Sequence, residues 1–262
     1  MLKFALIPAA LIGLAALACA QSELSGADQF PQFRGMSGLP GGGFAVDQDG
    51  NPGSVGAMSL STPIGYALGH RRFNLGVSVV SNNGTLKFFR NEHDASAGNG
   101  TASLMYGLDF GKAGRGTIGV MVLSSQGDHV YNLQYQPGGQ SGPVRYSVGV
   151  QDFFGRGGSA GETIVGDSVL SRSFFGVATA KVLDDTYISV GIGTRRFEKG
   201  FINASTNIGR DFKATIEHDG FNMNVGLACT LGYDRDDRGR NVTMFLGFVR
   251  NKYLTWAVNV SY

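Results

Sequence analysis

The sequence YLTWAVNVSY, residues 253–262, decides the fold because its side chains alternate in character along the whole stretch. Large apolar or aromatic residues occupy every second place, at Leu254, Trp256, Val258, Val260 and Tyr262. Small or polar residues fill the places between them. A period of two is typical of a β-strand that has one apolar face and one polar face. The stretch therefore predicts a sheet whose two faces meet different surroundings.

The same alternation runs back along the chain to residue 54, and turn sequences such as Asn82-Asn83-Gly84 and Pro137-Gly138-Gly139 divide it into short runs. We therefore predict an antiparallel meander. The expected strands are 54–60, 72–80, 85–90, 101–110, 115–124, 129–136, 143–152, 172–181, 186–194, 200–207, 211–218, 221–231, 242–249 and 253–262. That is fourteen strands. Because the alternation is weakest over 200–218, twelve strands with a longer loop over 195–220 is the alternative.

Two all-β architectures fit this pattern. A soluble sandwich places its apolar face inside and its polar face in water, whereas a membrane barrel places the apolar face against lipid and the polar face around a lumen. The polar face here is mostly Gly, Ser, Asn, Thr and Ala, and only 16% of all residues are charged. Several strands also reach the ~9–11 residues that cross a bilayer at a tilt. We therefore predict a transmembrane barrel of 12–14 strands, with its apolar face outward.

The N-terminal residues differ from the rest of the chain. Residues 1–20 combine Lys3, an apolar run and the small residues Ala18-Cys19-Ala20, which is the pattern of a cleaved export signal. Residues 21–53 are rich in Gly and Pro without strand periodicity, so we expect an irregular segment that can fill the barrel as a plug, followed by the barrel at 54–262. Its DQDGN sequence (47–51) starts like a calcium loop, but Pro52 replaces the required Gly, which indicates a plain turn.

An export signal, a β meander and a last strand that ends in an aromatic residue together resemble Gram-negative outer-membrane β-barrel proteins of the porin-like kind. The resemblance covers residues 54–262. It implies location in the cell outer membrane, with outer-membrane lipid around the barrel. It also implies that the barrel-assembly machinery reads the last strand, with Val258, Val260 and Tyr262 as the assembly signal and this strand closing the barrel.

Strand parity predicts which connections share an end of the barrel. If both termini are periplasmic, the connections 61–71, 91–100 and 153–171 fall on the extracellular side, where long loops are usual. The turns at 111–114 and 184–185 then fall on the periplasmic side.

The chain offers little catalytic chemistry. The candidates are His70, His93, His129 and His218. The last three lie beside acids, but adjacent residues of a strand point to opposite faces and make poor catalytic partners. The sequence contains no phosphate loop, metal signature or nucleophile elbow. We therefore predict no enzyme activity and no cofactor. A net charge of only +2 also argues against a nucleic-acid partner.

The predicted lumen suggests transport. Strand parity points Arg72, Lys87 and Arg145 inward together with amides, among them Asn222 and Asn224. Basic groups in a narrow pore favour anions, and amides suit sugar hydroxyls. Alternatively, these residues pair with acids such as Asp109, or they anchor residues 21–53 inside the barrel.

The predicted function is a passive channel, or an envelope-surface barrel, for small or saccharide solutes. A secreted β-sandwich adhesin and an outer-membrane hydrolase are the alternatives.

Overall fold

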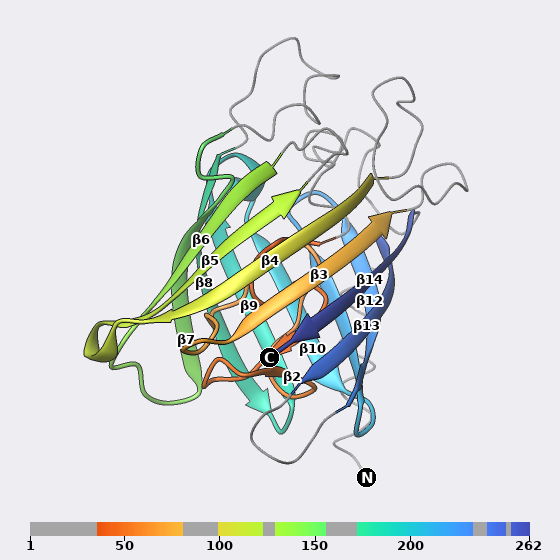
Figure 1. The fold of residues 1–262 in the computed structure, drawn as a ribbon, viewed down its shortest axis with the longest axis horizontal. Helices are drawn as coiled ribbons and strands as arrows, with labels where there is room; N and C mark the ends of the chain where they lie inside the picture. The colour runs from red at the N-terminus through yellow and green to blue at the C-terminus, as the bar shows by residue number, and fades with distance from the viewer. Residues whose placement is uncertain (1–35, 81–98, 123–128, 156–171, 233–239, 250–252) are drawn as a thin grey trace.

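The structure is a computed structural model that describes residues 36–80, 99–122, 129–155, 172–232, 240–249 and 253–262. Twelve antiparallel strands form a closed barrel in which each strand pairs with the next in sequence (Figure 1). They are β3 (Phe73–Val80), β4 (Asn99–Asp109), β5 (Gly114–Val122), β6 (His129–Pro137), β7 (Val144–Gln151), β8 (Ser173–Leu183), β9 (Thr186–Gly193), β10 (Phe201–Asn207), β11 (Phe212–His218), β12 (Met223–Leu231), β13 (Asn241–Val249) and β14 (Tyr253–Ser261). The predicted up-and-down barrel is confirmed.

The barrel closes where β14 pairs with β3. The main-chain N–H of Phe73 donates to the Tyr262 carbonyl at 2.9 Å, and the N–H of Tyr262 donates back to the Phe73 carbonyl at 3.0 Å. Their rings lie 5.5 Å apart between centroids. The prediction that residues 253–262 form the closing strand is therefore correct.

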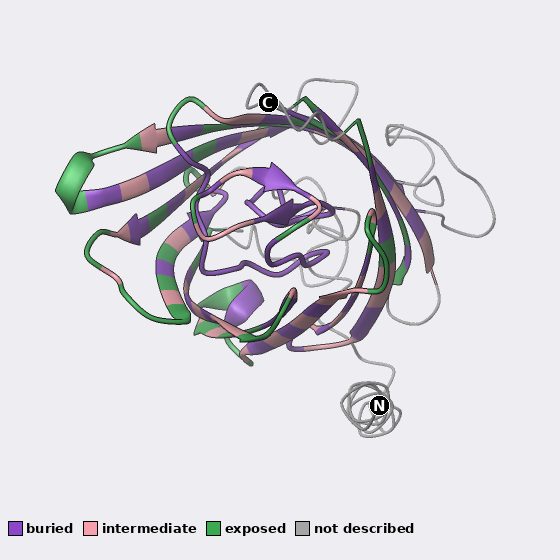
Figure 2. Cartoon of the chain, turned by 90° about the horizontal axis from the view of Figure 1, so that it is seen from below, coloured by how far each residue is buried: buried purple, intermediate pink, exposed green. Residues whose placement is uncertain are grey.

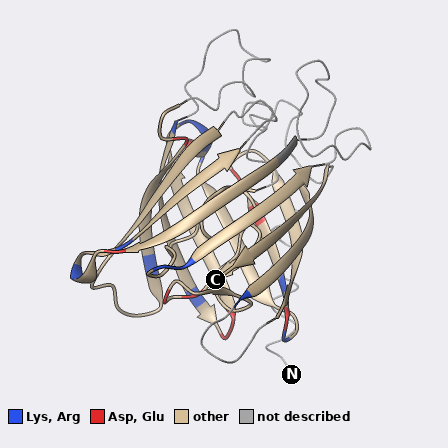
Figure 3. Cartoon of the chain, viewed as in Figure 1, with Lys and Arg blue, Asp and Glu red and all other residues tan. Residues whose placement is uncertain are grey.

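The apolar faces of most strands point outward, as predicted, although β8 also buries Phe175 and Val177 on its inner face. In β13, Met244, Leu246 and Phe248 are exposed on the outer wall, while the intervening Phe245 is 2% exposed and faces the lumen. The outer wall carries almost no charge, and the charged residues gather at the two ends of the barrel (Figure 3). This is the architecture of outer-membrane β-barrels, whose apolar band meets lipid. The sandwich alternative is wrong, because a single closed sheet has no second sheet to pack against.

The barrel has twelve strands, but the alternative that expected twelve placed the missing pair in the wrong part of the chain. Both β10 and β11 are present, so the proposed longer loop over 195–220 is wrong. Alternation is weak there because β10 turns the small residues Ala204 and Thr206 outward. The expected strand at 85–90 lies outside the described residues, and β3 pairs directly with β4.

The expected first strand at 54–60 is also wrong, because these residues lie inside the barrel. The N–H of Met58 donates to Ser205 Oγ at 3.0 Å, and the N–H of Leu60 donates to Glu217 Oε2 at 2.9 Å. The main chain at Met58 and Leu60 therefore donates to side chains of the wall and does not pair with a neighbouring barrel strand. The alternating sequence gave no sign of this difference.

Residues 36–69, called the plug below, fill the centre of the barrel (Figure 2). A short hairpin of β1 (Ala45–Val46) and β2 (Pro52–Gly53) is its regular part. Most plug residues are buried, and the exposed positions are near the hairpin turn at Asp49 and at Val55. The chain leaves the plug through His70 and Arg71 to enter β3.

The two ends of the barrel differ in their connections. The turns that join β4 to β5, through η3 (Gly111–Ala113), and β8 to β9 lie at the end where the chain enters β3 and leaves β14, called the termini end. β3 and β7 end, and β4 and β8 begin, at the opposite end of the barrel, called the loop end (Figure 1). Residues 61–71, expected as an extracellular loop, belong to the plug and the entry to β3, so that expectation is wrong.

Among the described residues, no helix is long and apolar enough to cross a membrane.

Candidate functional site

Polar side chains of the wall hold the main chain of the plug. The N–H of Gly65 donates to Thr179 Oγ1 at 2.7 Å, that of Ala67 to Gln136 Oε1 at 3.0 Å, and that of Leu68 to Thr117 Oγ1 at 2.8 Å. Residues 64–68 therefore lie across the inner faces of β8, β6 and β5. A buried main-chain donor needs a partner, and here the wall supplies it with side chains.

The same arrangement continues around the barrel with the roles reversed, because wall amides donate to plug carbonyls. These bonds are Asn132 Nδ2 to Gly38 O at 3.0 Å, Gln151 Nε2 to Ser37 O at 2.5 Å, Asn241 Nδ2 to Pro52 O at 2.8 Å and Asn259 Nδ2 to Gly43 O at 3.1 Å. The contacts come from β6 again and from three further strands, β7, β13 and β14. The plug is therefore anchored on all sides of the lumen.

Glu217 is the most heavily bonded of these anchors. Its side chain, on β11, is 1% exposed. The carboxylate accepts the N–H of Leu60 at 2.9 Å, the N–H of Ser61 at 2.9 Å and its hydroxyl at 2.6 Å, and the hydroxyl of Thr62 at 2.9 Å. Asn224 Nδ2 adds a bond at 2.8 Å. Hydrogen bonds to an ionised acceptor are roughly twice as strong as neutral ones.

Two more wall residues complete the surroundings of this loop of the plug. Arg196, in η5 (Arg195–Phe197), is buried and donates from Nη2 to the Ser61 carbonyl at 2.7 Å. Asn203 Nδ2 donates to Thr62 Oγ1 at 2.9 Å. A carboxylate, a guanidinium and an amide therefore bind three successive residues of the plug.

The plug also carries apolar side chains of its own. Phe44, Ile64, Tyr66 and Leu68 pack together with Tyr187 of the wall. Tyr66 and Tyr187 meet edge to face, with ring centroids 6.1 Å apart. Burial raises the pKa of the Tyr66 phenol to about 12, so this ring stays neutral at physiological pH. Polar side chains of the wall thus hold the main chain of the plug, while its apolar side chains pack on one another and on apolar residues of the wall.

The predicted lumen residues fall into two groups. Arg72 lies at the termini end, where its Nε donates to Asn51 of the plug at 3.2 Å. Arg145, also at the termini end, donates to the carbonyl of Val144 at 3.1 Å and to that of Gly142. Asn222 lies in the β11–β12 turn at the loop end, and the nearby Asn224 binds Glu217. Lys87 lies outside the described residues. The structure therefore does not bring the basic residues and these amides together.

Four basic residues lie at the termini end of the lumen: Arg72, Arg145, Arg115 and Lys213. Arg115 and Lys213, at the starts of β5 and β11, were not predicted as lumen residues, although strand parity points both side chains inward. Arg115 Nη2 donates to the Gln48 carbonyl of the plug at 2.6 Å. Asp47 and Asp49 of the plug act electrostatically on Arg115, so the plug partly neutralises this cluster.

Sequence reasoning also missed Glu217 and Arg196. Glu217 is one of the acids beside His218, but it faces inward from β11. An acid at an inward position of a predicted strand was the available signal.

The described histidines do not form a catalytic group, since His70 lies at the termini end whereas His129 and His218 lie at the loop end. His93 lies outside the described residues. Where the chain is described, no three His, Cys, Asp or Glu side chains converge to hold a metal ion. The DQDGN stretch is the predicted turn, closed by Asp47 Oδ1, which accepts the N–H groups of Asp49 and Asn51 at 2.8 Å each.

No protein-family model matches the chain, and no curated protein matches it. Two similar solved structures are a KdgM porin and a KdgM porin in complex with disordered oligogalacturonate. The first is 9% identical with a TM-score of 0.44, and the second 8% identical with a TM-score of 0.43. Each alignment covers 72% of this chain and 98% of the other. Similarities this distant do not bear on the solute.

Proposed function

We propose that the protein is an outer-membrane channel for small or saccharide solutes, closed by its plug in the described state and conducting when the plug shifts. The observation that carries this proposal is the chemistry of the contact between wall and plug. The wall holds the plug through hydroxyl, amide and carboxylate groups, all of which water can satisfy equally well once the plug moves. Apolar contacts, such as that of Leu39 with Phe175 and Val177, would be lost when the plug moves, but the polar contacts would be replaced by water.

The same wall groups explain the proposed solutes. Asn132, Asn203, Asn241 and Asn259 each present both a donor and an acceptor from the inner wall. When the plug is displaced, these amides face the lumen and match the hydroxyl groups of a sugar.

A disulfide between plug and wall tests whether the plug closes the channel. A Cβ atom placed on Gly43 would lie 3.6 Å from the Cβ of Ala257, within the range that a disulfide needs. We expect Gly43→Cys with Ala257→Cys, in a Cys229→Ala background, to lower planar-bilayer conductance at least about tenfold when oxidised, because a plug tied to β14 cannot leave. Reduction should restore the current.

Each single cysteine variant is the control, since Gly43 has a φ of +79° and a side chain there costs about 1–2 kcal/mol by itself. Equal conductance in the oxidised and reduced double variant would show that the plug does not close the pore. Absence of current in every variant would favour an envelope-surface barrel without transport.

The basic cluster gives a second prediction. Displacing the plug removes Asp47 and Asp49 from the termini end and leaves Arg72 and Arg145 facing the solute. We expect Arg72→Ala with Arg145→Ala to lower the chloride-to-potassium permeability ratio of the open channel roughly two- to threefold. Reversal potentials in a KCl gradient measure this ratio. Arg210→Ala, in the exposed β10–β11 turn, is the matched control, and an unchanged ratio in the double variant would refute a role in anion preference.

A further inference from the structure

Three inward side chains, Asn203, Glu217 and Asn224, form a row across β10, β11 and β12 near the loop end, called the polar row below. The strand register pairs Asn203 with Glu217 and Glu217 with Asn224, so they are direct neighbours on adjacent strands. Paired positions of antiparallel strands place their Cβ atoms about 4.5–5.5 Å apart. All three side chains are buried. The polar row therefore brings an amide, a carboxylate and a second amide together in one place.

Two hydroxyl groups of the plug occupy the polar row. The Ser61 hydroxyl donates to Glu217 Oε1 at 2.6 Å, and the Thr62 hydroxyl donates to Oε2 of the same carboxylate at 2.9 Å. Asn203 Nδ2 donates to Thr62 Oγ1 at 2.9 Å. Asn224 Nδ2 donates to Ser61 Oγ at 3.4 Å. Each hydroxyl therefore gives one hydrogen bond to the carboxylate and receives one from an amide.

This arrangement matches the chemistry of a sugar. A hydroxyl group carries one donor and two acceptor lone pairs, and two adjacent hydroxyls of a sugar ring can reach both oxygens of one carboxylate. A saccharide in place of Ser61 and Thr62 would form the same four bonds with the polar row. Arg196 Nη2, which donates to the Ser61 carbonyl at 2.7 Å, would supply a further donor to a sugar oxygen.

Aromatic rings lie beside the polar row. Phe201 is two residues before Asn203 on the same face of β10. The Phe197 ring lies 5.3 Å from that of Phe201 and 5.5 Å from that of Phe175, measured between centroids. Leu39 of the plug packs with these rings. The electron-rich face of an aromatic ring attracts the polarised C–H groups of a sugar, and the rings become available for this contact when Leu39 leaves.

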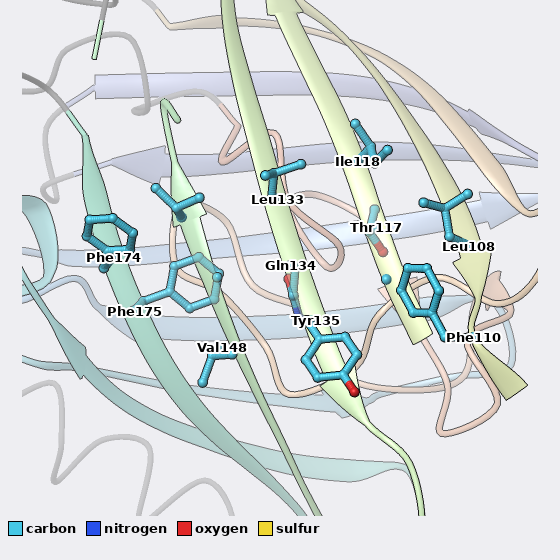
Figure 4. Close-up of a pocket in the computed structure, with 13 residues that line it drawn as sticks. Leu108, Phe110, Thr117, Ile118, Leu133, Gln134, Tyr135, Val148, Phe174 and Phe175 are labelled. Carbon is cyan, nitrogen blue, oxygen red and sulfur yellow. The ribbon is translucent and has the colours of Figure 1, made fainter. Parts of the chain in front are cut away.

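The cavity on the outer face of β4 to β8 has a different character (Figure 4). Most of its lining is apolar, and Ile118, Tyr135 and Val148 lie exposed on the outer wall. Such a lining suits the membrane around the barrel and does not select a polar solute. The chemistry that selects a sugar is therefore found on the inner wall.

We propose that the polar row is a binding site for a saccharide with adjacent hydroxyl groups, and that Ser61 and Thr62 occupy it as an internal mimic of that ligand. A saccharide that enters from the loop end competes with the plug for the same hydrogen bonds. Because it binds only where the plug has left, it shifts the barrel toward the open state. This inference rests on the proposed function, since it requires a plug that moves and a saccharide solute.

Titration calorimetry of the detergent-solubilised protein with maltotriose tests the site without the need for a current. We expect Ser61→Ala with Thr62→Val to bind maltotriose roughly tenfold more tightly than the original chain, because the competing plug loses two hydrogen bonds to Glu217. Polyethylene glycol of similar size, which has hydroxyls only at its two ends, should show no such gain. An equal gain for both solutes would overturn the proposal.

Two wall variants, each added to Ser61→Ala with Thr62→Val, separate a sugar site from a merely loosened plug. Asn203→Leu should weaken maltotriose binding several-fold, because the wall loses an amide that bonds the sugar. Thr117→Val removes the acceptor of the Leu68 N–H on the opposite wall, so it loosens the plug without touching the polar row and should not weaken binding. Heat-modifiable gel migration confirms that each variant is folded. The same affinity in both wall variants, or no gain from the plug variant itself, would overturn the proposal.

Planar-bilayer recording separates this inference from the proposed function. If maltotriose binds with the expected pattern but no variant conducts, the sugar site stands and the channel is refuted. If the barrel conducts but the plug variant gains no affinity for maltotriose, the channel stands and the sugar site is refuted.

Discussion

Replacing Glu217 with alanine is expected to shift the balance between plugged and conducting barrels toward conduction by about a thousandfold. The carboxylate accepts bonds from three successive plug residues, Leu60, Ser61 and Thr62. Alanine leaves their N–H and hydroxyl donors without an acceptor in the closed state. Leaving such a buried cluster unpaired costs about 4 kcal/mol, which converts to that factor. Water satisfies the same donors once the plug moves, so the penalty falls on the closed state alone.

Single-channel recording measures this balance as the ratio of closed to open time. Glu217→Gln should give a smaller shift, because the amide keeps one acceptor oxygen but turns an NH₂ group toward other donors. Glu198→Ala is the control, since Glu198 is an exposed acid after η5. If the barrel is folded on gels and Glu217→Ala keeps the closed-to-open ratio of the original chain, Glu217 does not hold the plug shut.

The second large effect is expected from Gly107→Ala in β4. A Cβ atom at this inward position would lie 1.9 Å from the carbonyl oxygen of Gly69 and 2.9 Å from that of Leu68. These are main-chain atoms, so they cannot turn aside as a flexible side chain would. The N–H of Gly107 also donates to the Arg72 carbonyl at 2.8 Å, which ties the chain leaving the plug to the wall. Overpacking here should cost about 3 kcal/mol of stability.

In a domain of this size, that loss corresponds to a fall of about 6–12 °C in the temperature of the heat-modifiable transition on gels. Gly176→Ala is the matched control, because a Cβ atom on that outward glycine would meet no atom within 4 Å. The free energy of unfolding of this variant should change by no more than about 0.5 kcal/mol. An equal, small change in both variants would show that residues 68–69 do not press against β4.

The wall could be predicted from the sequence because its environment imposes one rule on every strand. Leu246 and Val258 must face lipid, and Thr243 and Asn259 must face away from it, so a period of two is visible in the residues themselves. The plug could not be delimited in the same way. Met58 and Leu60 pack with Met36 of the plug and with apolar residues of the inner wall, and their alternation imitates a barrel strand.

The candidate site was only partly predictable for a related reason. Strand parity places a residue on the inner face but does not tell what it meets there. Asn224 was expected to line an open lumen, and its actual partner is Glu217 from the neighbouring strand. Contacts between Glu217 and residues 60–62 join segments about 156 positions apart, with no local sequence signal.

The pairing of β14 with β3 closes the barrel around the plug. Asn74 and Asn259 bond across this junction although 185 positions separate them in the chain. Bringing such distant segments together carries a large loop-closure cost and slows folding. The plug precedes β3, so it is available as a scaffold on which Thr117, Thr179 and Glu217 can gather their strands before the ends meet. Shortening residues 36–69 would remove these bonds from the inner faces of β5, β8 and β11.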